Sequence, residues 1–177
     1  MKFITTSLSG VFLIEPSLLQ DSRGFFGRTW CQKEFSEQRL NTDWVQSNLS
    51  FNQHKGTLRG MHYQKEPHQE IKLLYCLQGS IYDVLLDLRA DSATQGQWQA
   101  FELNAENHLG LYIPAGFAHG FQTLSEHCLL SYQMSAFYHP ESAAGVRWND
   151  PAFGIQWPLP PVMLSERDQT WPLASEA

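Results

Sequence analysis

The sequence is poor in cysteine: Cys31, Cys76 and Cys128 are the only three among 177 residues, and no Cys-x-x-Cys pair occurs. An odd number of widely spaced cysteines is typical of reduced thiols in a cytoplasmic protein rather than of a disulfide framework or a zinc ribbon. The sequence also lacks any apolar run close to the ~18 residues that a membrane span requires. Its first residues lack the apolar segment and small-residue cleavage site of a secretory leader.

Basic residues are scarce as well, with 12 Lys and Arg against 18 Asp and Glu, so that the net charge is −6. Nucleic-acid binding requires a basic surface, so this balance argues against nucleic acid as the main partner, although it leaves room for a locally basic pocket. The length and the 42% hydrophobic content predict a single globular domain over residues 1–177. Such a domain buries most of its apolar surface without disulfides or a structural metal.

Alternation of apolar and polar residues recurs at near-regular spacing, with Gly and Pro between the segments, and predicts an all-β fold with many short strands. The expected strands cover residues 10–16, 25–30, 44–51, 58–64, 71–77, 80–88, 96–103, 109–116, 119–125 and 129–138. Residues 31–40 form the one good helical stretch, with Phe35 and Leu40 toward the core. Six of the nine prolines lie at or after Pro140. We therefore expect a loop-rich C-terminal segment that wraps over the strands.

The stretch YIPAGFAHGF at 112–121 resembles a recurring piece of the double-stranded β-helix, or cupin, fold, a jelly-roll barrel. In metal-dependent cupins a histidine equivalent to His119 joins a His-x-His pair and a glutamate from an earlier strand, which gives three or four ligands. Here the earlier strand offers only His62, followed in a loop by His68 and Glu70. The fold is thus indicated, whereas a metal site is not.

The stretch from Gly56 to Leu74 places ionisable residues among apolar ones near the middle of the chain, either as a solvated face or as the floor of a site. Strand alternation puts His62 on a face with small or apolar neighbours and Arg59 on the other, unless a bulge intervenes. Taken alone, His62 is interpreted as a core histidine. Lys72 lies between apolar residues of a predicted central strand, where an unpartnered charge is costly, and this favours a pocket.

Two further patterns are ambiguous on their own. Tyr132 and Tyr138 are six residues apart and share one face if one strand carries both, either as core residues or as a proton donor and a stacking platform. The segment Ser165–Asp168 is either a polar loop or a means of returning Asp168 to orient a histidine.

Taken together, these stretches resemble the dTDP-4-dehydrorhamnose 3,5-epimerase family along nearly the whole chain. The similar segments are DSRGFF (21–26), VQSNLS (45–50), GTLRGMHYQ (56–64), the strand with Lys72, YDVLLDLR (82–89), YIPAGFAHGF (112–121), WNDPAFGIQWP (148–158) and LSERD (164–168). The resemblance implies a cupin-type homodimeric isomerase of deoxysugar and dTDP-rhamnose biosynthesis, as used for lipopolysaccharide. It implies no metal or organic cofactor, and a nucleotide-diphosphate 4-keto-6-deoxy sugar as substrate.

Residue by residue, the resemblance implies that His62 is the catalytic base, Asp168 its orienting partner, Tyr132 the acid on the opposite face of the sugar, and Lys72 the group beside the C4 oxygen. The C4 ketone acidifies the hydrogens at C3 and C5. A base removes one of them, an enolate forms, and a proton returns to the other face. Inversion therefore requires proton-transfer groups on opposite sides of the ring.

The resemblance also implies substrate-binding roles. The diphosphate or sugar contacts are Arg23, Arg59 and Arg167, the nucleotide contacts are Phe26, Gln46, Asn48 and Tyr138, and His119 lies in the sugar pocket. Lys65, Glu66, His68 and Glu70 are expected to be solvated charges of a connecting loop. In one departure, Arg28 stands where many members have glutamate on the nucleotide side. We hypothesise that Arg28, across the pocket, affects which nucleotide is accepted.

We expect epimerisation of dTDP-4-dehydro-6-deoxy-D-glucose at C3 and C5. Alternatives within the class are inversion at C3 or C5 only, on a dTDP, CDP or GDP sugar. Alternatives from other classes are a metal-dependent cupin with His62, His68 and His119 as ligands, or a non-catalytic binder of sugar nucleotides. Two opposed proton carriers argue against a mere binder.

Overall fold

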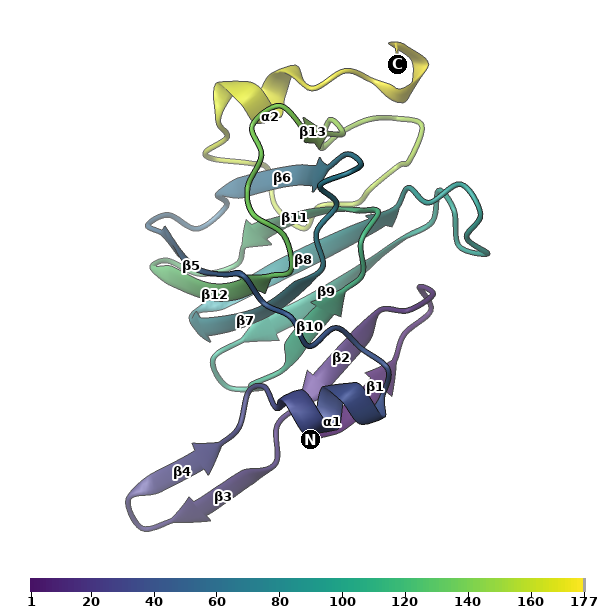
Figure 1. Ribbon diagram of the computed structural model, residues 1–177. Coiled ribbons are helices and arrows are strands. Elements are labelled where there is room, and N and C mark those ends of the chain that lie inside the picture. The colour runs from purple at the N-terminus through teal and green to yellow at the C-terminus, as the bar shows by residue number, and fades with distance from the viewer. Residues whose placement is uncertain (177) are drawn as a thin grey trace.

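The computed structural model describes residues 1–176, in which two antiparallel sheets face each other (Figure 1). The first sheet has six strands in the spatial order β1-β2-β10-β7-β12-β5. Their bounds are β1 Lys2–Thr5, β2 Phe12–Glu15, β10 Gly110–Ile113, β7 Lys72–Gln78, β12 Cys128–Met134 and β5 Gln46–Asn52. The strand β5 forms one edge of this sheet, and neither sheet closes on itself.

The second sheet has five strands in the order β13-β6-β11-β8-β9. Their bounds are β13 Ala143–Gly145, β6 Leu58–Gln64, β11 Phe117–Thr123, β8 Ser80–Asp87 and β9 Trp98–Asn104. The two sheets exchange consecutive strands, because β6 and β8 belong to the second sheet and β7 to the first. This exchange places β6 and β7, which carry the charged stretch of the sequence, on facing walls of one interior.

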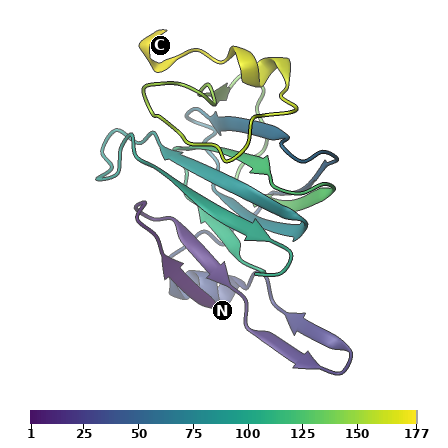
Figure 2. The ribbon, with the colours of Figure 1, turned by 180° about the vertical axis from the view of Figure 1, so that it is seen from behind.

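The remaining elements are a hairpin and three short helices. The hairpin of β3 Leu18–Asp21 and β4 Gly24–Gly27 pairs only with itself and projects from the end of the molecule opposite the C-terminal segment (Figures 1 and 2). The helices are α1 Gln32–Glu37, α2 Glu166–Thr170 and a 3₁₀ turn at Ala174–Glu176. Within the described residues, no helix has the length and apolar character needed to cross a membrane.

Three apolar clusters explain how the sheets are held together. One cluster lies between the sheets and includes Leu85, Leu111 and Leu130. A second covers the outer face of the six-stranded sheet, where Phe35 of α1 is completely buried. The third covers the outer face of the five-stranded sheet, where Ile155 of the C-terminal segment packs. The expected wrap is therefore confirmed, and its apolar residues stabilise the sheet by burial.

Most expected strands are present, but the predicted strand at 129–138 ends at Met134. The chain leaves the sheet at Ser135, whose hydroxyl accepts a hydrogen bond from the N–H of Ile71 at 2.8 Å. Tyr138 therefore lies in a loop, and the argument that it shares a strand face with Tyr132 is wrong. The strands β1, β3 and β13 and the helix α2 were not predicted, because short edge elements carry little periodicity.

An irregularity in β6 decides how the charged stretch faces the interior. His62 pairs with His119 and Arg59 pairs with Phe121, so that β6 spans three residue steps where β11 spans two. This extra residue is a β-bulge, which re-aims side chains along the strand. Gly60 has φ 141°, and a Cβ there would lie 2.5 Å from the Cα of Gly120. Glycine at both positions permits this close approach, which lets Arg59 and His62 line the same cavity.

Candidate active site

A cavity of about 1050 Å³ opens between the two sheets, next to the apolar cluster between them. Leu74 of β7 belongs to both, since it contacts the cluster and also lines the cavity. The volume suits a large ligand, because small-molecule pockets usually measure ~300–1,000 Å³. Most predicted site residues line it, namely Gln46, Asn48, Arg59, His62, Lys72, His119, Tyr132, Tyr138, Arg167 and Asp168.

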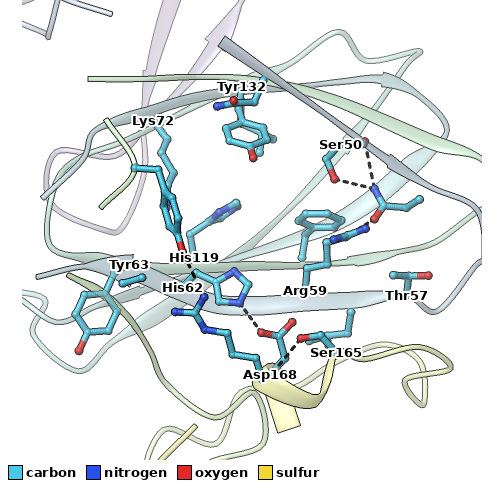
Figure 3. Close-up of a pocket in the computed structure, with 18 of the residues that line it drawn as sticks. Ser50, Thr57, Arg59, His62, Tyr63, Lys72, His119, Tyr132, Ser165 and Asp168 are labelled. Carbon is cyan, nitrogen blue, oxygen red and sulfur yellow. Dashed lines mark hydrogen bonds and ion pairs between the residues drawn. The ribbon is translucent and has the colours of Figure 1, made fainter. Parts of the chain in front are cut away.

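His62 and Asp168 form a hydrogen-bonded pair, with 2.5 Å between Nε2 and Oδ1 (Figure 3). Asp168 is buried on α2, whereas the His62 side chain is 44% exposed toward the cavity. Ser165 caps α2, because its hydroxyl accepts a hydrogen bond from the N–H of Asp168 at 3.1 Å. The sequence Ser-Glu-Arg-Asp is a helix-start signal, with Ser at the N-cap and acidic residues in the first turn, and it identifies α2 in retrospect.

Burial by itself raises the pKa of Asp168, but hydrogen bonds and charge interaction with His62 outweigh it, with help from Ser165 and the backbone of Gly60. The net result is a pKa below the ordinary value. Asp168 is therefore a carboxylate that can accept the ring N–H of His62. A carboxylate in this position fixes the histidine tautomer and stabilises its protonated form, which makes the free ring nitrogen a competent base.

Tyr132 lies on the opposite wall from His62. It comes from β12 of the six-stranded sheet, whereas His62 comes from β6 of the five-stranded sheet, and the two side chains lie on either side of the cavity (Figure 3). Burial raises the pKa of Tyr132, and the positive charge of Arg59 opposes this only in part. The phenol is therefore protonated at neutral pH and can donate a proton.

Lys72 is buried on β7 and forms an ion pair with Glu70, with 2.9 Å between Nζ and Oε1. Lys72 therefore has the charged partner that a lysine among apolar strand residues requires. The prediction that Glu70 is a solvated loop charge is wrong, because its side chain is only 4% exposed and lines the cavity. The loop after Pro67 turns inward before β7 begins, which sequence periodicity does not show. Lys65 and Glu66 are exposed, as expected.

His119 on β11 lines the cavity and pairs with Asp83 on β8, with 2.9 Å between Nε2 and Oδ2. Asp83 is fully buried, and burial raises its pKa against the opposing charges of His119 and Lys72. Asp83 was not predicted as part of the site. Its signal was a carboxylate among apolar residues of a predicted strand, the same pattern that pointed to Lys72.

The cavity walls carry polar and cationic groups that suit a nucleotide diphosphate. The Arg59 Nε donates to Asn52 Oδ1 at 2.7 Å, and the guanidinium of Arg167 lies 4.7 Å from the ring centre of Trp171. Gln46 accepts a hydrogen bond from the backbone N–H of Tyr138 at 2.7 Å, which brings the loop after β12 back to the cavity. Asn52 and Trp171 line this site but were not predicted.

Arg23, Phe26 and Arg28 do not line the cavity of this chain. All three lie at or next to β4, in the hairpin that projects from the body (Figure 1). Arg28 forms an ion pair with Glu34 at 3.1 Å, so its charge is balanced within the N-terminal region. The placement of Arg28 across the pocket is therefore wrong for a single chain.

Among the described residues, His62, His68 and His119, the three histidines considered as metal ligands, do not form a group whose ligand atoms lie within reach of a single ion. Within residues 1–176, the one group of three potential ligands in reach of a single ion is His68, His139 and Glu141. The rings of His68 and His139 are stacked, with centroids 3.5 Å apart and planes within 15°. The in-plane lone pairs of the two rings therefore lie in nearly parallel planes and do not meet at one position.

The facing sheets and a cavity with proton-transfer groups on opposite walls define a cupin-type isomerase. The family model described as dTDP-4-dehydrorhamnose 3,5-epimerase matches residues 5–176. The chain belongs to the dTDP-4-dehydrorhamnose 3,5-epimerase family.

The similarity extends over whole chains. An enzyme of this name from Methanothermobacter thermautotrophicus is 43% identical, over 96% of this chain and 92% of its own length. A crystal structure from Elizabethkingia anophelis has a TM-score of 0.95 at 43% identity, and covers 99% of this chain and 97% of that one. A Legionella pneumophila structure in complex with dTDP-4-keto-L-rhamnose has a TM-score of 0.91 at 40% identity, with 97% and 92% covered. A 3′-monoepimerase from Streptomyces bikiniensis, bound to dTDP-quinovose, scores 0.89 at 31% identity, with 97% and 87% covered.

Proposed function

We propose that this protein converts dTDP-4-dehydro-6-deoxy-D-glucose to dTDP-4-dehydro-L-rhamnose by inversion at C3 and C5, without a metal or organic cofactor. The observation that supports this most strongly is the placement of the His62–Asp168 pair and Tyr132 on facing sheets. A sugar ring between them presents one face to a base and the other to an acid, which is what inversion requires.

In the proposed mechanism, the free nitrogen of His62 removes the proton from C3 or C5, next to the C4 ketone. The C–H bonding electrons form a double bond to C4, and the π electrons of the carbonyl move to O4 to give an enolate. Lys72 donates a hydrogen bond to this oxygen, and removal of such a donor costs about 3–4 kcal/mol of transition-state stabilisation. Tyr132 then returns a proton to the opposite face of the carbon. His62 holds the proton that it removed, and Asp168 stabilises the imidazolium. Proton exchange with water then deprotonates His62 and reprotonates Tyr132 before the second inversion.

Hydrogen exchange tests this function directly. Wild-type protein incubated with dTDP-4-dehydro-6-deoxy-D-glucose in D₂O should place deuterium at both C3 and C5, as measured by NMR. Label at C3 alone would instead support a monoepimerase, as in the Streptomyces relative. CDP and GDP sugars in parallel establish the nucleotide preference. No label with any sugar nucleotide would contradict the epimerase proposal.

The second proton carrier has its own test. Tyr132→Phe removes the phenol and leaves the base in place, so we expect epimerisation to slow by about 10²–10⁴-fold while C–H exchange continues. The ratio of exchange to inversion should therefore rise above the wild-type ratio. An equal loss of both rates would show that Tyr132 does not act after proton removal.

We propose that the protein functions as a homodimer in which the β3–β4 hairpin of one chain reaches the pocket of its partner. Two observations support this. Arg23, Phe26 and Arg28, which are predicted to bind substrate, lie in or directly after the hairpin and do not line their own cavity, and Leu19 and Phe26 are each 70% exposed. Apolar residues this exposed on a projecting hairpin suit a protein interface.

Mixing two inactive variants tests the exchange of hairpins. A chain with Phe26→Ala keeps an intact catalytic pair, and a chain with His62→Asn keeps an intact hairpin. If hairpins act on the partner, a mixed dimer regains one complete site and the mixture recovers activity. If each hairpin serves its own chain, mixing recovers nothing.

A further inference from the structure

Glu70 is a buried carboxylate in the cavity wall, and protein groups satisfy only one of its two oxygens. The residue is 8% exposed, and Oε1 forms an ion pair with Lys72, 2.9 Å from Nζ. Oε2 is buried and has no hydrogen-bond partner among residues 1–176, although the side chain lines the cavity. A buried acceptor without a partner is costly, so the position is suited to a donor supplied by the ligand.

The chemistry of Glu70 limits which ligand group can meet it. An ionised carboxylate is an acceptor only, so its partner must carry a hydrogen. The diphosphate oxygens, the C4 carbonyl and the enolate oxygen are all acceptors and are repelled by it. Arg59 and Arg167 supply the cationic contacts elsewhere in the cavity. The remaining donors of the proposed substrate are its hydroxyl groups and the N3–H of thymine. The base is remote from the C4 carbonyl assigned to Lys72, so a sugar hydroxyl is the group that fits.

Lys72 limits which hydroxyl this is. Glu70 Oε1 lies 2.9 Å from the Nζ that is assigned to the C4 oxygen in the proposed mechanism. Glu70 is therefore next to C4, and only the atoms on C3 and C5 are near neighbours of that oxygen. In a 4-keto-6-deoxy sugar, C5 carries a methyl group and the ring oxygen, neither of which donates. C3 carries a hydroxyl.

We propose that Glu70 Oε2 accepts a hydrogen bond from the C3 hydroxyl of the substrate, an inference that rests on the proposed epimerase function. Glu70 is then a substrate-binding residue that recognises the configuration at C3. Inversion at C3 moves this hydroxyl relative to the ring, so the contact differs between substrate and C3-inverted product. The pairing of Glu70 with Lys72 thus links recognition at C3 to stabilisation at C4.

A pair of substrates separates this role from a purely structural one. The first is dTDP-4-dehydro-6-deoxy-D-glucose, and the second is its analogue without the C3 hydroxyl. Both keep the C5 hydrogen, so the efficiency of C5 exchange in D₂O can be measured for each. The proteins are wild type, Glu70→Ala, Glu70→Gln and, as the matched control, Glu66→Gln on the exposed part of the same loop.

If Glu70 accepts a hydrogen bond from the C3 hydroxyl, Glu70→Ala should lower the efficiency of C5 exchange about 10- to 100-fold more for the hydroxylated substrate than for the analogue, because hydrogen bonds to charged groups are strong. Glu70→Gln keeps the size of the side chain but not its charge. It should lower the efficiency of C5 exchange about 3- to 10-fold more for the hydroxylated substrate than for the analogue. Glu66→Gln should leave both substrates unchanged. If Glu70→Ala does not fold, Glu70→Gln alone decides.

Equal losses on both substrates would overturn the inference, because they would show that Glu70 acts only as the counter-ion that positions Lys72. This outcome leaves the proposed function intact, since exchange by the wild type persists. Failure of the wild type to exchange any 4-keto sugar would instead contradict the proposed function itself.

Discussion

Two histidine–aspartate pairs have their histidines on adjacent strands of one sheet, and they differ mainly in their access to solvent. His62 and His119 are cross-strand partners, and each bonds an aspartate through Nε2. The His62 side chain is 44% exposed, whereas that of His119 is 11% exposed. The pKa of Asp168 is lowered and that of Asp83 is raised. The same residue types thus form an open pair with an ionised aspartate and a buried pair with a desolvated aspartate.

The comparison shows how surroundings assign the roles. A base must exchange its proton with the substrate and then with water, which favours the open His62–Asp168 pair. The buried pair lies near the charge of Lys72, and His119 lines the cavity, where it is predicted to contact the sugar. Charge near Asp83 is less well solvated, so a cycle of protonation there is more costly. We infer that only the open pair removes protons from the substrate.

The largest expected difference between the pairs follows from removing the open histidine. His62→Asn should lower turnover by about 10²–10⁴-fold with little loss of substrate affinity, because general base catalysis is lost while the pocket remains. Steady-state kinetics and calorimetric titration with dTDP measure the two effects. Turnover within about tenfold of wild type would show that His62 is not the base.

The partner of the base should matter next most. Asp168→Asn replaces the acceptor with an amide that can also donate, so His62 loses its fixed tautomer and the stabilisation of its charged form. We expect turnover to fall by about 10²-fold with affinity preserved. A loss below threefold, measured under saturating substrate, would remove Asp168 from the mechanism.

The buried histidine should show a different kinetic pattern. His119→Asn removes a wall of the sugar pocket and leaves both proton carriers, so we expect KM to rise about tenfold while kcat changes by less than fivefold. A fall in kcat as large as that of His62→Asn would mean that the buried pair also takes part in proton transfer.

The smallest expected effect is the opposite pH dependence of the two aspartates. The folded-state pKa of Asp168 is below the ordinary value of 3.8, so its contribution to stability is present above pH 3.8 and is lost as the pH falls through the folded pKa. The folded-state pKa of Asp83 is above 3.8, so its contribution is present below 3.8 and is lost as the pH rises through the folded pKa.

Urea unfolding at several pH values measures this difference in Asp168→Asn and Asp83→Asn. The stability gap between wild type and Asp168→Asn should widen as the pH rises through the acid range. The gap for Asp83→Asn should narrow. Gaps that change in the same direction with pH in both variants would contradict the assignment of an ionised Asp168 in the open pair and a desolvated Asp83 in the buried one.

Much of this arrangement can be predicted from sequence, because alternation is a local property. The strand with His62 was predicted with its observed bounds, Leu58–Gln64, and the two faces of β7 follow from its pattern of apolar residues. The family resemblance added the pairing of His62 with Asp168, which are 106 residues apart. No local pattern contains a contact at that separation.

The features that were missed depend on how segments meet in space. The bulge in β6 arises from its register against β11, and the burial of Glu70 depends on the path of a loop. Phe26 matched the family motif, but the motif does not say that its hairpin points away from the chain's own cavity. Asp83 was within reach of the desolvation argument that identified Lys72, because both are charged residues in predicted central strands.

Hydrogen exchange at C3 and C5 in D₂O, measured side by side for His62→Asn and His119→Asn, tests the central claim most directly. If the open pair alone removes protons, His62→Asn abolishes exchange at both carbons, and His119→Asn retains it at saturating substrate. If exchange persists in His62→Asn and disappears in His119→Asn, the buried pair holds the base and the account is wrong.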